Sequence, residues 1–252
     1  MWTPFWTVLV KETRRFMRIG LHTLVAPILT GLLYLVIFGE ALSKHLPLYE
    51  GVRYIDFIIP GLIMMSVLQN AFANTASSLI QAKIGGSLTF LLMPQIPGAV
   101  LGLAYLLASA LRAILVGLGL YAVCLLWATP PVKAPGLLIA FGLSGTFIMA
   151  SFGLITALWA DKYDQMGAVQ NFVIMPLTFL SGVFYSTNSL PPLWKEVSEW
   201  NPFYYLVEGF RAGFLGTQTT DPTVSLTVVL LFTALSMAVA LGLLAKGWKI
   251  RA

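Results

Sequence analysis

The sequence predicts an all-α integral membrane protein, because it is strongly apolar, poor in charge and divided into long uncharged runs. Of its 252 residues, 58% are hydrophobic and 10% are charged, and the mean hydropathy is +0.84. Soluble domains carry about 25% charged residues, because charge solvates their surface. Lipid is therefore the expected solvent for most of this surface. This composition excludes a soluble enzyme, a nucleic-acid-binding module and a disulfide-stapled secreted domain.

Six uncharged or nearly uncharged runs are each long enough to cross a membrane, which takes about 20 apolar residues. They predict transmembrane helices at about 21–42, 57–80, 105–128, 136–160, 166–187 and 224–245. We expect a single membrane domain over 1–252. It would contain an amphipathic interface helix at 1–20, spans one to five within 21–187, re-entrant outer helices at 188–216 and span six at 224–245.

An even number of spans places both termini on the same side of the membrane. Nine basic residues fall on that side and five on the other, and the positive-inside bias makes the richer side cytoplasmic. The nine are Lys11, Arg14, Arg15, Arg18, Lys83, Lys162, Lys246, Lys249 and Arg251; the five are Lys44, Arg53, Lys133, Lys195 and Arg211. The basic residues therefore flank apolar segments, and the net charge of +5 does not indicate nucleic-acid binding.

The first 20 residues predict an amphipathic helix in the cytoplasmic interface. Thr3 and Pro4 match an N-cap and first-turn pair, and Lys11, Arg14 and Arg18 share one face. Basic residues on such a face reach lipid phosphates. The helix is expected mainly as a membrane anchor, with a cytoplasmic protein partner as the alternative.

Two interhelical segments are unusual. Segment 81–104 contains a short apolar turn between Gly85-Gly86 and Pro94, which suits docking to another protein or an interfacial turn; the sequence leaves both open. Segment 188–216 is too polar to span and too aromatic for a free loop. Pro191-Pro192 and Asn201-Pro202 predict two short helices that dip into the outer leaflet, as an outer gate or as an aromatic belt.

Few polar groups lie within the spans. Arg112 is the one charge within a predicted transmembrane span, and we expect it to snorkel to the cytoplasmic headgroups, with an internal partner or an anionic substrate as alternatives. Asn70, Asn74, Gln170 and Asn171 are amides that tie helices together or line a polar path. No paired carboxylates of a proton relay, no GxxxxGK[ST] phosphate loop and no GxSxG motif occur.

Four segments resemble the ABC-2 type exporter permeases. They are PGLIMMSVLQNAFANTASS (60–78), LLMPQIP (91–97), LSGVFYSTNSLPPLW (180–194) and NPFYYLVEGFRAGFLG (201–216), which occur here in the family's order. The resemblance spans nearly the whole chain, and the last two elements are specific together. It implies a homodimer of permeases in the membrane lipid of a bacterial inner membrane, bound to two copies of a separate cytoplasmic ATP-binding subunit.

What the resemblance implies for function is the transmembrane half of an exporter for a hydrophobic or lipid-linked substrate. The chain itself would be no enzyme and hold no cofactor or metal, because ATP and Mg²⁺ would bind in the partner. A coupling helix at about 83–93 would dock into the ATPase, although it carries no charge beyond Lys83. A polytopic lipid enzyme or a secondary carrier is the alternative.

The resulting candidate residues form three sets. Contacts with the ATPase subunit are expected from Lys83, Leu88, Phe90, Leu91, Leu92, Arg14, Arg15 and Lys162. Pathway candidates are Asn70, Asn74, Gln170, Asn171 and Tyr185. Outer-gate candidates are Trp194, Trp200, Tyr204, Tyr205 and Phe214.

Overall fold

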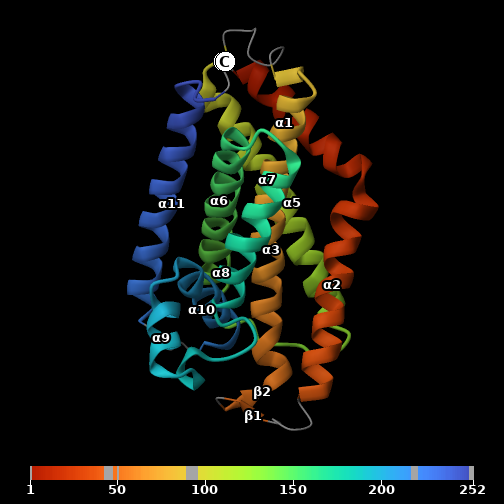
Figure 1. Ribbon diagram of the computed structural model, residues 1–252. Helices are drawn as coiled ribbons and strands as arrows, with labels where there is room; N and C mark the ends of the chain where they lie inside the picture. Colours follow the sequence, from red (N-terminus) through yellow and green to blue (C-terminus); the bar gives the residue numbers. More distant parts are fainter. Residues whose placement is uncertain (1, 43–47, 50, 89–95, 217–220, 250–252) are drawn as a thin grey trace.

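A computed structural model describes residues 2–42, 48–49, 51–88, 96–216 and 221–249 as an upright bundle of helices (Figure 1). In chain order the elements are α1 (Trp2–Arg18), η1 (Leu21–Val25), α2 (Ala26–Tyr34), η2 (Leu35–Leu42), β1 (Leu48–Tyr49), β2 (Val52–Arg53), α3 (Tyr54–Ile84), α5 (Gly98–Cys124), α6 (Pro135–Trp159), α7 (Tyr163–Val169), η3 (Gln170–Ile174), α8 (Met175–Phe179), η4 (Thr187–Ser189), α9 (Pro192–Glu199), α10 (Pro202–Leu215) and α11 (Pro222–Ala245). Strands β1 and β2 form one small antiparallel hairpin.

Within the described residues, five helices are long and apolar enough to cross a membrane. They are Leu21–Gly39, Tyr54–Ile84, Gly98–Cys124, Pro135–Trp159 and Thr223–Ala245. These match five of the six predicted spans, although the third begins at Gly98 directly after Pro97, earlier than the expected 105. The all-α membrane fold is thus supported, whereas the six-span arrangement is not fully reproduced.

The predicted fifth span is wrong in its extent. Helical structure runs from Tyr163 to Phe179 instead of from 166 to 187. At about 1.5 Å per residue, this segment reaches only about 26 Å, short of the roughly 30 Å of hydrocarbon. The chain leaves the helix near Gly182, whose φ of +78° suits glycine and does not continue an α-helix.

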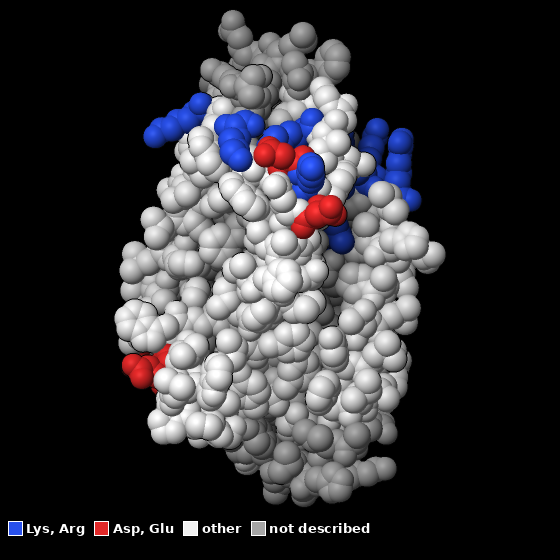
Figure 2. All heavy atoms as spheres, in the orientation of Figure 1, with Lys and Arg blue, Asp and Glu red and all other residues white. Residues whose placement is uncertain are grey.

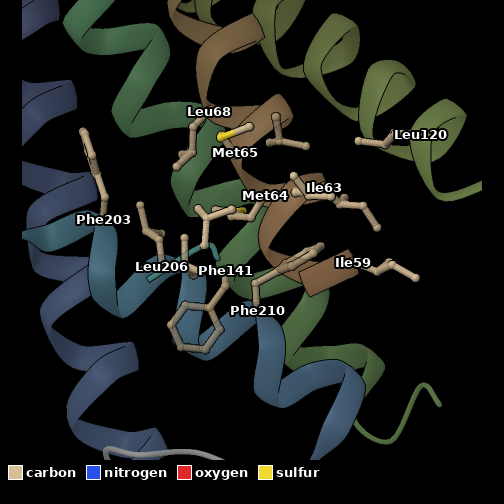
Figure 3. Close-up of a cluster of buried hydrophobic side chains, with 14 of the residues drawn as sticks. Ile59, Ile63, Met64, Met65, Leu68, Leu120, Phe141, Phe203, Leu206 and Phe210 are labelled. Atoms are coloured by element: carbon tan, nitrogen blue, oxygen red, sulfur yellow. The ribbon is translucent and has the colours of Figure 1, made fainter. Parts of the chain in front are cut away.

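Helix α3 is the centre of the bundle. It packs against α5, α6 and α10, and most of its side chains are buried. Its backbone approaches α6 closely at Gly153, where an added Cβ would lie 2.5 Å from the carbonyl oxygen of Phe72. Figure 3 shows side chains of α3, α5, α6 and α10 converging in one apolar cluster, with Met64 beside Leu206 and Phe210. This core fixes the position of α3.

Helices α1 and α11 bring both ends of the chain to the same end of the bundle, opposite the β-hairpin and α9 (Figure 1). Lys and Arg side chains gather at that end on the face shown in Figure 2. The arrangement agrees with an even number of crossings, because an odd number would place the termini at opposite ends.

The two predicted outer helices are present as α9 and α10. Pro192 begins the first, and the Asn201 side chain caps the second by accepting a hydrogen bond of 3.0 Å from the Phe203 N–H. Gly216, with φ of +72°, ends α10 in the left-handed conformation. Lys195, in the first turn of α9, donates to Asn188 Oδ1 over 3.3 Å.

Candidate functional site

A buried polar junction joins α1, α3 and α5. The amphipathic helix α1 turns Glu12 inward, because Val8, Glu12 and Phe16 share its packed face. Glu12 Oε2 accepts a bond of 3.0 Å from Arg15 Nε and another from the Ser78 hydroxyl. Glu12 is only 1% exposed, so its charge depends on these partners in place of water.

Two guanidinium groups converge on one amide of α3 in this junction. Arg15 Nη2 and Arg112 Nη1 donate to Asn74 Oδ1 over 3.0 and 3.3 Å. Arg112 Nη2 also donates to Asn70 Oδ1 over 3.1 Å, and Asn74 Nδ2 donates to Ser109. The expectation that Arg112 snorkels to the headgroups is therefore wrong: it is buried and held by internal partners, because α3 presents two amides at its depth.

A polar pocket of about 280 Å³ lies between η1 and α2, α3 and η3. Its polar lining includes His22, Thr30, Ser66, Gln69, Asn70 and Gln170. Two predicted pathway residues, Asn70 and Gln170, therefore meet here. Asn74 lies in the buried junction, Asn171 is exposed, and Tyr185 donates to the carbonyl of Phe179 near the opposite end.

Gln69, another amide of the second predicted span, also lines the pocket, although it was not among the pathway candidates. Gln69, Ala73 and Ser77 follow one another at four-residue spacing on one face of α3 and are partly buried. The other residues of this stretch of α3 are buried. That spacing of small or polar residues was the available signal, because such residues on one face of an apolar helix mark a side that does not pack in the core.

A clamp at the end of the bundle that carries the chain ends joins α3, α6 and the segment after α11. Lys83 Nζ donates to the carbonyls of Leu158 and Ala160 over 3.1 and 2.8 Å and pairs with Asp161 over 2.9 Å. Lys249 lies 3.7 Å from the same carboxylate. These cations satisfy orphan carbonyls at the C-terminus of α6. The hydrogen bond and charge of Lys83, and then the charge of Lys249, lower the pKa of Asp161.

The predicted ATPase contacts fall into two structural groups. Arg14 and Lys162 are exposed, whereas Arg15 and Lys83 bond within the bundle. Leu88 is buried in an apolar cluster with residues of α1, α5, α6 and α11. Phe90, Leu91 and Leu92 lie outside the described residues, so their contact role stays a prediction.

A buried arginine of α10, which the sequence analysis counted only among the outer basic residues, joins several elements at the opposite end of the bundle. Arg211 pairs with Glu208, donates over 3.2 Å to the carbonyl of Phe57 and over 2.7 Å to that of Gly182, and lies 3.9 Å from the Phe57 ring centre. It thereby fixes α10 to the start of α3. Its rigid fork of donors suits several carbonyls at once.

The outer-gate candidates divide between the surface and the core. Trp194 of α9 and Trp200, which directly follows α9, are exposed, the latter at 82%. Tyr204 and Phe214 of α10 are buried, and Tyr205 is partly buried. The aromatic residues of α10 therefore pack largely inside the bundle. The sequence analysis had instead placed them at the pathway mouth or at the outer interface.

Comparison with known proteins adds to this geometry. Residues 3–215 match the family model described as ABC-2 type transporter. The chain is 36% identical to the inner membrane transport permease YadH of Escherichia coli K12, over 99% of this chain and 98% of that protein. It is also 23% identical to nodulation protein J of Rhizobium leguminosarum bv. viciae, over 97% and 94%. This chain belongs to the ABC-2 type transporter family, as a multi-pass membrane transport permease.

Proposed function

We propose that this chain is the transmembrane half of an ATP-driven exporter that moves a hydrophobic or lipid-linked substrate outward. It would act as a homodimer in the inner membrane, with both termini cytoplasmic, on two copies of a separate ATP-binding subunit. ATP and Mg²⁺ would bind in that subunit. The basic residues gathered at the end that carries α1 and the close of α11 support this orientation (Figure 2).

The observation that carries the proposal is that one continuous helix connects the end that carries segment 83–93 to the polar pocket. Helix α3 has 31 residues, which correspond to about 46 Å. Lys83 lies at one end, beside the start of segment 83–93, and Gln69 lines the pocket four turns away. A helix of this length, packed on most sides, moves as a rigid unit and can carry a displacement from one end to the pocket.

In this mechanism, closure of the ATP-binding subunits on ATP pushes on segment 83–93. The push shifts α3 relative to α2 and η3, which form the other walls of the pocket. The pocket then changes its access from the cytoplasmic leaflet to the outer side. At the far end, Arg211 couples α3 to α10, so that the same displacement reaches the outer helices.

The test uses the permease co-expressed with a separate ABC-type ATP-binding subunit from the same genome. Leu91→Asp with Leu92→Asp is expected to abolish co-purification and the stimulation of ATP hydrolysis. Leu88→Asp is made separately, because Leu88 is buried and its change also disturbs packing. The control is Leu193→Asp, at an exposed position of α9 at the other end of the bundle.

Membrane insertion and monodispersity should be equal in Leu91→Asp/Leu92→Asp and in the control. If the double variant still binds the ATP-binding subunit and stimulates hydrolysis, segment 83–93 is not the coupling element. If the wild-type permease binds no ATP-binding subunit at all, the exporter proposal itself is refuted.

A further inference from the structure

The polar junction holds more positive than negative charge among the described residues. Arg15 and Arg112 both bond Asn74 Oδ1, whereas Glu12 is the carboxylate that accompanies them. Glu12 bonds Arg15, so within the described part of the chain Arg112 has two amide oxygens as partners and no carboxylate. Its Nε atom is buried without a hydrogen bond. A buried guanidinium without an anion is costly, and its field extends into the neighbouring low-dielectric space.

That neighbouring space is the polar pocket. Asn70 forms the partition between the two, because its Oδ1 accepts from Arg112 while the residue lines the pocket. The described pocket lining contains no Asp or Glu. His22, Gln69 and Gln170 instead present N–H groups that can donate to an anion, whereas the Thr30 hydroxyl donates to the Ala26 carbonyl over 3.0 Å. The electrostatic preference of the pocket is therefore for a negative group.

The size and surroundings of the pocket further restrict the kinds of ligand that fit it. A volume of about 280 Å³ equals about nine water molecules at about 30 Å³ each, enough for a phosphate or another small headgroup and too little for an oligosaccharide. Two of the elements that line it also carry exposed apolar side chains, Leu29 and Leu33 on α2 and Phe172 on η3. An acyl chain can lie along such apolar helix surfaces while its headgroup occupies the pocket.

We propose that this pocket binds the anionic headgroup, a phosphate or carboxylate, of an acyl amphiphile, with Arg112 supplying the charge through the Asn70 partition. The role of the amphiphile as cargo rests on the proposed function, whereas the binding does not. An anion about 8 Å from a unit charge, at an effective dielectric of about 20, gains up to roughly thirtyfold in affinity, so an effect of about tenfold is expected.

Binding is tested on the purified full-length permease by native mass spectrometry, with dioctanoyl phosphatidylglycerol as the anionic probe. Dioctanoyl phosphatidylcholine, with the same chains and no net charge, is the matched probe. Wild type should prefer the anionic probe by about tenfold, and Arg112→Gln should abolish that preference. Arg112→Lys should keep part of it, because the charge remains while the second amide contact is lost.

Two further variants separate the pocket from its surroundings. Ala73→Phe fills the pocket without changing any charge and should weaken both probes, and it keeps the proposal testable if Arg112→Gln does not fold. Arg14→Gln with Arg18→Gln removes exposed charge from α1 and should leave the tenfold preference intact. A preference that follows Arg14 and Arg18 and ignores both Arg112 and Ala73 would overturn the proposal.

A final arm distinguishes cargo from resident lipid. Proteoliposomes that contain the permease, its ATP-binding subunit and ATP receive a fluorescent phosphatidylglycerol. The probe is placed in the leaflet on the side of the ATP-binding subunit. Probe that crosses the membrane identifies the bound amphiphile as cargo; probe that binds without crossing identifies it as a lipid held by the permease. Either result supports the site. Absence of any anionic preference in wild type removes the site and leaves the exporter proposal standing, because that proposal is tested by ATPase binding.

Discussion

Replacing Glu12 with Gln is expected to destabilise the permease by about 3 kcal/mol, although the change lies in a helix that the sequence alone places at the membrane surface. Removing one partner of a buried ion pair costs about 3–5 kcal/mol, because the other charge stays buried. The lower end applies here, since Arg15 keeps two bonds to Asn74 after the change. The fraction unfolded should rise on the order of a hundredfold.

The measurement is the free energy of unfolding in lipid nanodiscs by steric trapping. Lys11→Gln is the matched control: its ammonium lies 3.6 Å from Glu12 but is about half exposed, so less than about 1 kcal/mol should be lost. The double variant Glu12→Gln/Arg15→Gln should recover part of the loss, because neither charge is then left alone. Equal stabilities for Glu12→Gln and Lys11→Gln would refute the buried junction.

Three further outcomes are expected. Arg211→Lys should cost about 2–3 kcal/mol of unfolding free energy in the same assay, because lysine cannot bond two carbonyls and stack on Phe57 together; a loss below about 0.5 kcal/mol would contradict the role of Arg211. The lowered pKa of Asp161 means that its stabilising effect is present above its ordinary pKa of about 3.9 and is lost as pH falls through the lowered value. Wild type should therefore lose more thermal stability than Asp161→Asn between about pH 6 and pH 3, and equal losses would argue against the clamp. Reporter fusions after Ala252 and after Pro135 should report opposite sides of the membrane, with the first cytoplasmic; finding both on one side would refute the predicted topology.

Much of the architecture follows from local sequence. Length and apolarity suffice to locate five spans, because a helix in lipid must satisfy its own backbone and carry few charges. Pro192, Asn201 and Pro202 likewise place the ends of the outer helices, since capping and proline geometry act within a single turn. The predicted extent of the fifth span was wrong because the helix ends before Gly182, within an apolar run. One glycine among 22 is a weak sequence signal for such an end.

Only the tertiary structure decided where the charged side chains lie and which groups they bond. The sequence places Arg112 in a span and Glu12 in an amphipathic helix. Considered on its own helix, each side chain would be expected to reach water or the lipid headgroups. The packing of α1, α3 and α5 brings Asn70 and Asn74 to the guanidinium of Arg112 and brings the Ser78 hydroxyl to Glu12. The physical reason is that a hydrogen bond between helices depends on their mutual rotation and depth, which no local pattern of a single helix contains.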